Sequence, residues 1–108
     1  MEAYTVYITK PAERDIVNAV HYIDEILHNP QAGDALLNAV EEAADSLALF
    51  PERFPLTGDA ILAAGGIRWI GIKNYLALYT VDKHVHQIRI IRFLYAKSNW
   101  QDILKSDF

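Results

Sequence analysis

The feature that most constrains this chain is a pair of apolar repeats at helical spacing, with very little sequence between them. The first repeat predicts an amphipathic helix over residues 11–28, through Ala12, Ile16, Ala19, Val20, Ile23 and Leu27. The second predicts a helix from Pro30 to about Phe50, through Ala35, Leu36, Val40, Ala43, Leu47 and Phe50. Thr9 and Asn29 stand just before these helices, where their side chains are suitable caps. Two helices joined by so short a link should pack antiparallel, as a hairpin.

The remainder of the chain has the residue types and turn signals of β-strands. Aromatic and β-branched residues predict one strand before the hairpin and three after it, over residues 3–9, 67–72, 74–81 and 85–96. The links at Lys73-Asn74 and Asp82-Lys83-His84 are short enough for hairpin turns. The last three strands should therefore be antiparallel neighbours in one sheet.

The segments between and after these elements complete the predicted fold. Pro51 and Pro55 end the second helix, and residues 56–66 are expected to be irregular. Asn99 is a suitable cap for a short final helix in residues 99–108. The order is β-α-α-β-β-β with this short C-terminal helix, and the hairpin must cover one face of an antiparallel sheet. We predict a two-layer α+β fold and a single domain over residues 1–108.

Charge is distributed unevenly along the 108 residues, whose formal net charge is -4. Residues 1–66 carry three basic and eleven acidic side chains, whereas residues 67–108 carry seven basic and three acidic ones. The helix layer should therefore be acidic and the sheet basic. The chain has no cysteine, no apolar run long enough to span a membrane and no signal-peptide pattern at its N-terminus. We expect a cytoplasmic protein without membrane contact.

Known catalytic motifs do not account for this sequence. Gly65-Gly66 lacks the residues of a phosphate-binding loop, and His84 and His86, expected on one side of a strand, have no third metal ligand nearby. We therefore predict no metal and no cofactor. The last strand is more informative, because alternation places Ile88, Ile90, Arg92 and Leu94 on one face. An arginine among apolar neighbours either pairs with a carboxylate of the helix layer or faces a ligand.

Four stretches of the chain resemble the RelE/ParE toxin superfamily of type II toxin–antitoxin systems, and its ParE-like branch of plasmid stabilisation proteins in particular. They are "PAERDIVNAVHYI", "LALFPERFP", "IRWIGIKNYLALYTVD" and "IRIIRFLYAKSNW", which together extend over nearly the whole chain. The last stretch is similar to a common ParE-like ending, which Arg92 and Trp100 match. It departs from that ending at Tyr95, where histidine is usual, and over residues 96–99.

The resemblance implies a toxin that a cognate antitoxin neutralises. ParE-like members inhibit growth by binding a protein target, DNA gyrase, without chemistry of their own. RelE-like members instead cleave mRNA at the ribosome, and a degenerate toxin that binds only its antitoxin is a further alternative. RelE-type toxins carry more basic residues than this chain and often have arginine where Leu76 stands. We therefore favour the ParE-like activity, and we expect an apolar antitoxin helix to bind between the helix pair and the sheet.

Basic and aromatic residues of the basic half are the candidates for binding the target, and no residue is assigned a catalytic role. These candidates are Arg68, Lys73, Arg89, Arg92, Tyr95, Lys97 and Trp100. Tyr95, Lys97 and Arg92 would also form a minimal nuclease set, since tyrosine and lysine can transfer protons. A homodimer is a further expectation if the core does not absorb all of its large aromatic residues, Phe50, Phe54, Trp69 and Phe93.

Overall fold

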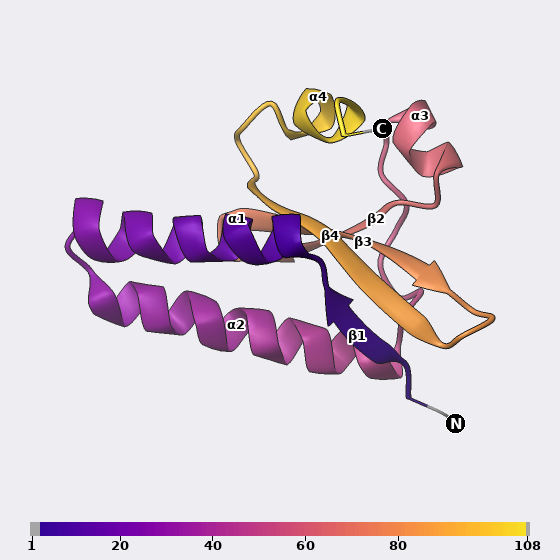
Figure 1. Ribbon diagram of the computed structural model, residues 1–108, viewed down its shortest axis with the longest axis horizontal. Helices are drawn as coiled ribbons and strands as arrows, with labels where there is room; N and C mark the ends of the chain where they lie inside the picture. Colours follow the sequence, from indigo (N-terminus) through magenta and orange to yellow (C-terminus); the bar gives the residue numbers. More distant parts are fainter. Residues whose placement is uncertain (1–2, 108) are drawn as a thin grey trace.

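The helical hairpin lies on one face of a four-stranded sheet in the computed structural model of the protein, which describes residues 3–107. Its first helix, α1 (Lys10–His21), is capped by Thr9, whose Oγ1 accepts a hydrogen bond from the N–H of Ala12. The second, α2 (Pro30–Leu49), is capped by Asn29, whose Oδ1 accepts from the N–H of Ala32. The caps predicted for these two helices and the hairpin are thus confirmed, and the two helices run antiparallel (Figure 1). Asn99, the cap predicted for the final helix, stands at the N-cap position there, but its side chain makes no cap hydrogen bond.

The end of the first predicted helix is not α-helical. Residues Tyr22–Ile26 form a π-helical turn, η1, and His28 then takes a left-handed backbone conformation with φ of 51° before α2 begins. A π turn inserts an extra residue into the helical repeat and therefore rotates the side chains that follow it. The predicted α-helix over residues 11–28 is correct in extent to within two residues, but its last part differs in geometry.

The sheet contains β1 (Thr5–Ile8), β2 (Arg68–Ile72), β3 (Tyr75–Asp82) and β4 (Gln87–Tyr95) in the spatial order β1-β4-β3-β2. The last three strands are antiparallel neighbours, as predicted, and β1 pairs in parallel with the first half of β4. β4 begins later than predicted because residues 83–86 form a turn in which His86 has φ of 50°. His84 and His86 therefore do not share the face of a strand.

A β-bulge changes which side chains of β4 face the helices. Tyr79 pairs with Ile90 and Leu78 pairs with Arg92, so Ile91 is the extra residue. Beyond the bulge, the side chains of β4 alternate between the two faces of the sheet in the opposite sense. Phe93 therefore packs in the same core as Ile90, beneath the helices. The prediction that Arg92 shares a face with Ile88 and Ile90 was therefore wrong, because it assumed an uninterrupted strand.

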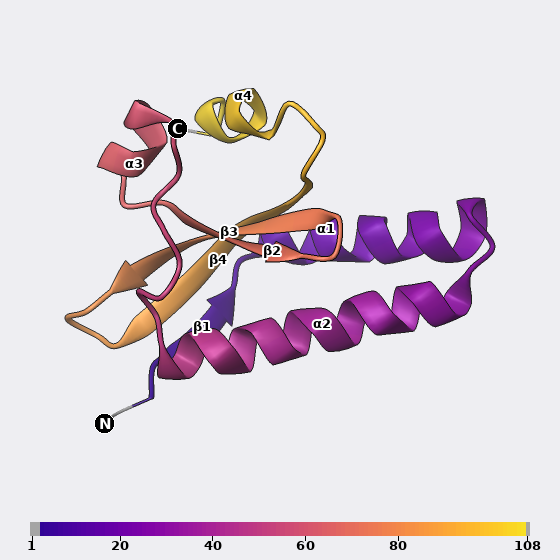
Figure 2. The same ribbon diagram turned by 180° about the vertical axis from the view of Figure 1, so that it is seen from behind.

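Two short helices cover part of the opposite face of the sheet. They are α3 (Ala60–Ala64) and α4 (Trp100–Lys105), and Figures 1 and 2 show both on the side away from α1 and α2. α3 lies in the segment predicted to be irregular, where the Asp59 carboxylate caps the N–H groups of Ile61 and Leu62. The α+β fold is confirmed, with a second small core on this side formed by Leu62, Ile67, Leu78, Leu94 and Leu104.

The main core absorbs only some of the large aromatic residues. Phe93 is buried and Phe54 packs against the core, whereas Phe50 and Trp69 are exposed by 52% and 36%. The homodimer suggested by these residues remains a prediction. Within residues 3–107, no helix is both long enough and apolar enough to cross a bilayer.

Candidate functional site

Arg92 lies at the centre of a cluster of ion pairs between three parts of the chain. Its Nε donates to Asp15 Oδ2 at 2.6 Å and its Nη2 to Asp15 Oδ1 at 3.1 Å, a bidentate pair with α1. Its Nη1 donates to Asp107 Oδ2, beyond α4, at 2.9 Å. The hydrogen bonds that Arg92 donates to Asp15 and, to a smaller extent, to Asp107 hold the pKa of Arg92 above its ordinary value. The guanidinium of Arg92 is thus paired with two carboxylates.

Asp15 has a second role at the edge of the sheet. The pairing of β1 with β4 ends at Ile8 and Ile90, so the following part of β4 has a neighbouring strand, β3, on one side only. Thr9 Oγ1 donates to the carbonyl of Ile90, and Asp15 Oδ2 accepts from the N–H of Phe93 at 3.0 Å. The start of α1 therefore replaces the missing strand, since an edge N–H buried here would otherwise lack a partner.

A cleft of about 550 Å³ opens beside this cluster, between the start of α1, β4 and the end of α4. Arg14 and Arg89 line it together with Arg92. The guanidinium carbon of Arg89 lies 5.1 Å from the ring centroid of Tyr7, which positions this side chain over the ring. We call this site the arginine cleft.

A second depression lies at the far end of the hairpin, next to the β2–β3 turn. It has a volume of about 600 Å³ and is lined by Tyr22, Ile23, Leu27, Asn29, Ala32, Asn74, Tyr75 and Tyr95. The Tyr75 ring stacks on Phe93 at 4.9 Å between centroids and meets Tyr95 edge-on at 5.6 Å. Burial raises the pKa of Tyr75, with Tyr95 and Tyr22 adding to the effect, so its hydroxyl stays protonated. We call this site the tyrosine groove.

The structure does not gather the seven predicted target-binding residues into one site. Arg89 and Arg92 line the arginine cleft, Tyr95 lines the tyrosine groove, and Lys73 lies in the β2–β3 turn beside that groove. The others lie apart from both. Arg68 bonds to the Phe54 carbonyl at 2.7 Å and to Glu52, Lys97 is exposed after β4, and Trp100 packs against the small core.

Sequence reasoning missed Arg14, Asp15 and Tyr22, all of which come from the first helix and the turn after it. Their spacing marks them only as polar or partly exposed helix positions. Asp15 carried one usable signal, because an arginine expected among apolar neighbours requires a carboxylate partner. Among residues 3–107, no three acidic or histidine side chains form a group suited to a metal ion.

Comparison with protein families decides what kind of protein has this arrangement. A family model described as the ParE toxin of the type II toxin–antitoxin system parDE matches residues 6–100. The chain belongs to the ParE toxin family. The match includes all of β1 except Thr5, the other three strands, the hairpin and Arg92, so the predicted resemblance is confirmed.

Solved structures show the same fold at low sequence identity. The ParE-family chain is similar to a chain of the chromosomal ParDE toxin–antitoxin system from P. aeruginosa, with a TM-score of 0.67 and 16% identity. That match covers 88% of this chain and 98% of the other. A chain of the toxin–antitoxin complex RelBE2 from Mycobacterium tuberculosis gives a TM-score of 0.61 at 23% identity, over 86% and 98% of the two chains. No curated protein matches the sequence significantly.

On this ParE fold the two depressions lie at opposite ends of α1. The arginine cleft adjoins its first turns, and the tyrosine groove lies beyond its last residue, His21. A helix of this length extends about 18 Å, at 1.5 Å per residue. The ParE-family chain therefore carries two separate surfaces, of which one is rich in arginine and the other aromatic.

Proposed function

We propose that this ParE-family toxin inhibits growth in the cytoplasm by binding a protein target, DNA gyrase, within a plasmid-stabilisation module. The observation that carries this proposal is the pairing of two arginines that the sequence suggested for target binding, Arg68 and Arg92. Arg92 is held by Asp15 and Asp107, and Arg68 by Glu52 and a backbone carbonyl. A ribonuclease needs cations aimed at the phosphate that reacts, and both of these are already paired. This favours binding over RNA cleavage.

The tyrosine groove is the site that we assign to the cognate antitoxin. Its lining joins apolar residues, including Ile23 and Leu27, to three tyrosine rings, with Asn29 and Asn74 as polar groups. An amphipathic helix places apolar side chains in such a groove at positions three and four apart. Tyrosine rings contribute much contact area there and keep their hydroxyls at the wet edge.

The alternative is ribosome-dependent mRNA cleavage, and one observation favours it. Tyr95 is 43% exposed, and Lys97 is exposed two residues further on. A tyrosine and a lysine so placed are able to take part in proton transfer. In this mechanism Arg92 would have to leave its ion pairs during the reaction.

Supercoiling of plasmid DNA by purified gyrase, with the purified chain added, tests the proposal. We expect inhibition by the wild-type chain and loss of inhibition in Tyr95→Ala plus Lys97→Ala, which leaves the ion pairs of Arg92 intact. Phe50→Ala plus Lys10→Ala is the matched control, because Phe50 is exposed to a similar extent, 52%, and lines neither the arginine cleft nor the tyrosine groove. Full gyrase activity with folded chain, together with site-specific mRNA cuts at ribosomes, would overturn the proposal.

A further inference from the structure

The arginine cleft contains two cations with which no carboxylate of residues 3–107 forms an ion pair. Arg14 and Arg89 both line it and both are exposed. Within residues 3–107, neither forms an ion pair, whereas Arg68, Lys83, Arg92 and Lys105 all do. Two like charges facing one cleft repel each other, so an anion between them is favourable.

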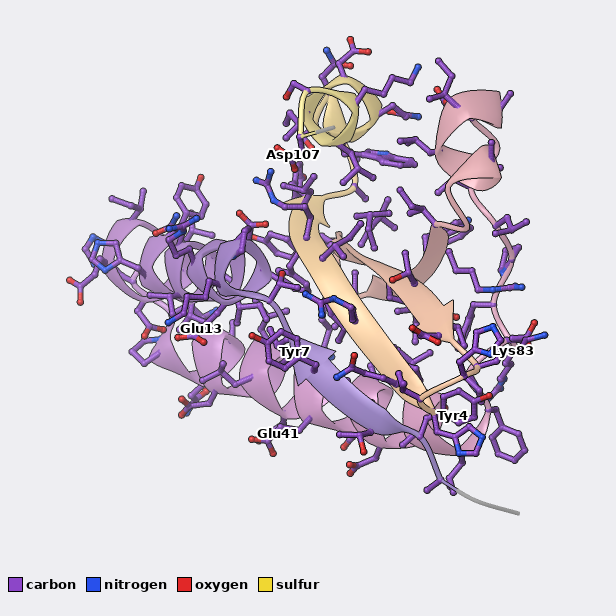
Figure 3. The ribbon with its side chains drawn as sticks, turned by 45° about the vertical axis from the view of Figure 1, so that its right-hand side comes forward. Tyr4, Tyr7, Glu13, Glu41, Lys83 and Asp107 are labelled. Carbon is purple, nitrogen blue, oxygen red and sulfur yellow. The ribbon has the colours of Figure 1, made fainter. Side chains whose placement is uncertain are left out.

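The cleft already holds carboxylates, which indicates the chemistry that it accepts. Asp107, near the end of the chain, reaches Arg92 Nη1 at 2.9 Å, and its side chain is 40% exposed. Figure 3 shows Asp107 between α4 and β4. Asp15 accepts from Nε and Nη2 of Arg92, so three of the five N–H groups of this guanidinium are bonded to carboxylates. Arg14 and Arg89, which form no ion pair within residues 3–107, carry most of the open donors in the cleft.

Tyr7 restricts the orientation of one of these donors. The Arg89 guanidinium lies over the Tyr7 ring, at 5.1 Å from its centroid, so an apolar surface covers one face of the cation. The N–H groups at its edge remain available to an acceptor. A guanidinium held in this way loses less conformational freedom when it binds a carboxylate.

We propose that the arginine cleft binds an acidic peptide segment of a partner protein, whose carboxylates pair with Arg14 and Arg89. This surface is distinct from the tyrosine groove, and the inference does not depend on gyrase being the target. Nucleic acid is a poorer occupant, because it needs several phosphate contacts along an extended basic surface. The neighbouring helix layer instead carries acids such as Glu13 and Glu41, which are visible in Figure 3 and would repel a long polyanion.

Fluorescence anisotropy of a labelled hexaglutamate peptide, titrated with the full chain at low salt, tests this assignment. Arg14→Gln and Arg89→Gln should each weaken binding by roughly threefold, the effect of one exposed ion pair, and together by about tenfold. Lys10→Gln is the control, since this exposed cation lies on the same helix and does not line the cleft. An equal loss in Lys10→Gln, or no loss in the double variant, would overturn the proposal.

A second set of measurements separates a carboxylate site from a phosphate site. Asp107→Asn removes an internal carboxylate and should tighten hexaglutamate binding by about twofold, whereas Asp34→Asn, on the exposed side of α2, should not. Hexaglutamine, which is uncharged, should not bind. If a single-stranded oligonucleotide binds more tightly than hexaglutamate and loses that binding in the double arginine variant, the cleft is a nucleic-acid site instead. Thermal melting of each variant verifies that it is folded.

Discussion

Asp15 and Arg92 are separated by 77 residues in the sequence, yet Asp15 Oδ2 accepts a 2.6 Å hydrogen bond from Arg92 Nε. The same oxygen accepts from the backbone N–H of Phe93. One carboxylate thus fixes the charged side chain and closes the edge of β4. The arginine that matches the typical ParE-like ending is in this way tied to the first helix of the hairpin.

Replacing Asp15 by asparagine should destabilise the fold. The variant leaves a mostly buried guanidinium, whose side chain is 18% exposed, with only Asp107 as a charged partner. We expect the free energy of unfolding to fall by about 2–3 kcal/mol, since an ion pair this little exposed is costly to break. Urea denaturation measures the change. Asp107→Asn, at a more exposed site, should cost less than about 1 kcal/mol; equal costs would contradict the central role of Asp15.

The ion pair between Asp59 and Lys105 should make stability depend on acid pH. The hydrogen bond from Lys105, with those from the N–H groups of Leu62 and Ile61, lowers the pKa of Asp59 below its ordinary value. A carboxyl whose pKa is depressed by folding contributes stability above its unfolded pKa and loses it as the pH falls through the folded pKa. Asp59→Asn keeps an N-cap oxygen but removes this contribution. As the pH is lowered below about 4, the region where free aspartate titrates, the urea midpoint of this variant should therefore fall less steeply than that of the wild type. Parallel plots of the urea midpoint against pH for the variant and the wild type would exclude this contribution of Asp59.

The antitoxin assignment predicts a specific loss at the tyrosine groove. Tyr22 lines the groove and is 49% exposed, so Tyr22→Ala removes a contact surface with little effect on the core. Binding of the cognate antitoxin, measured by isothermal titration calorimetry, should weaken by about 2 kcal/mol, as for an aromatic interface residue. Phe50→Ala, outside both the groove and the arginine cleft and 52% exposed, should bind the antitoxin as the wild type does. The assignment would be wrong if the two variants weakened binding equally.

Asp24 and Gly33 form a crowded contact between the π turn and α2. Asp24 Oδ1 is buried without a hydrogen-bond partner among the described residues, and a Cβ at position 33 would overlap it. Gly33→Ala should therefore destabilise the wild type by about 1 kcal/mol. In the Asp24→Ala background the same change should stabilise by up to about 1 kcal/mol, because alanine favours a helix interior over glycine. A double-mutant cycle measures the coupling between the two substitutions from their free energies of unfolding in urea. If the two free-energy changes were additive, the contact would be disproved.

Local signals in the sequence were sufficient for most of the secondary structure. The caps Thr9 and Asn29 and the helical apolar repeats predicted the hairpin, because these signals act within one or two turns of the chain. The helix α3 was missed, since five residues of AILAA after Asp59 contain too little periodicity to distinguish a helix from a loop. The π turn η1 was missed for a related reason, as it continues the same apolar repeat with one residue added.

The candidate sites were predicted less completely than the fold. Tyr95, Arg89 and Arg92 were chosen as polar or aromatic residues of the last strand, and they line one or other of the two depressions. Their partners were not foreseen, because Asp15 and Tyr22 belong to elements far away in sequence. The bulge at Ile91 also placed Arg89 and Arg92 in the same cleft, which strict alternation would have kept on opposite faces.

The sequence by itself determined the hairpin, the three antiparallel strands and the family, since periodicity, caps, turns and motif residues are all local properties of the chain. Only the tertiary structure decided how Arg92 is used. Its environment depends on a bulge, on an aspartate 77 residues away and on an aspartate beyond α4. An ion pair forms where folding brings opposite charges together and excludes water from them, and distance along the sequence does not contain that information.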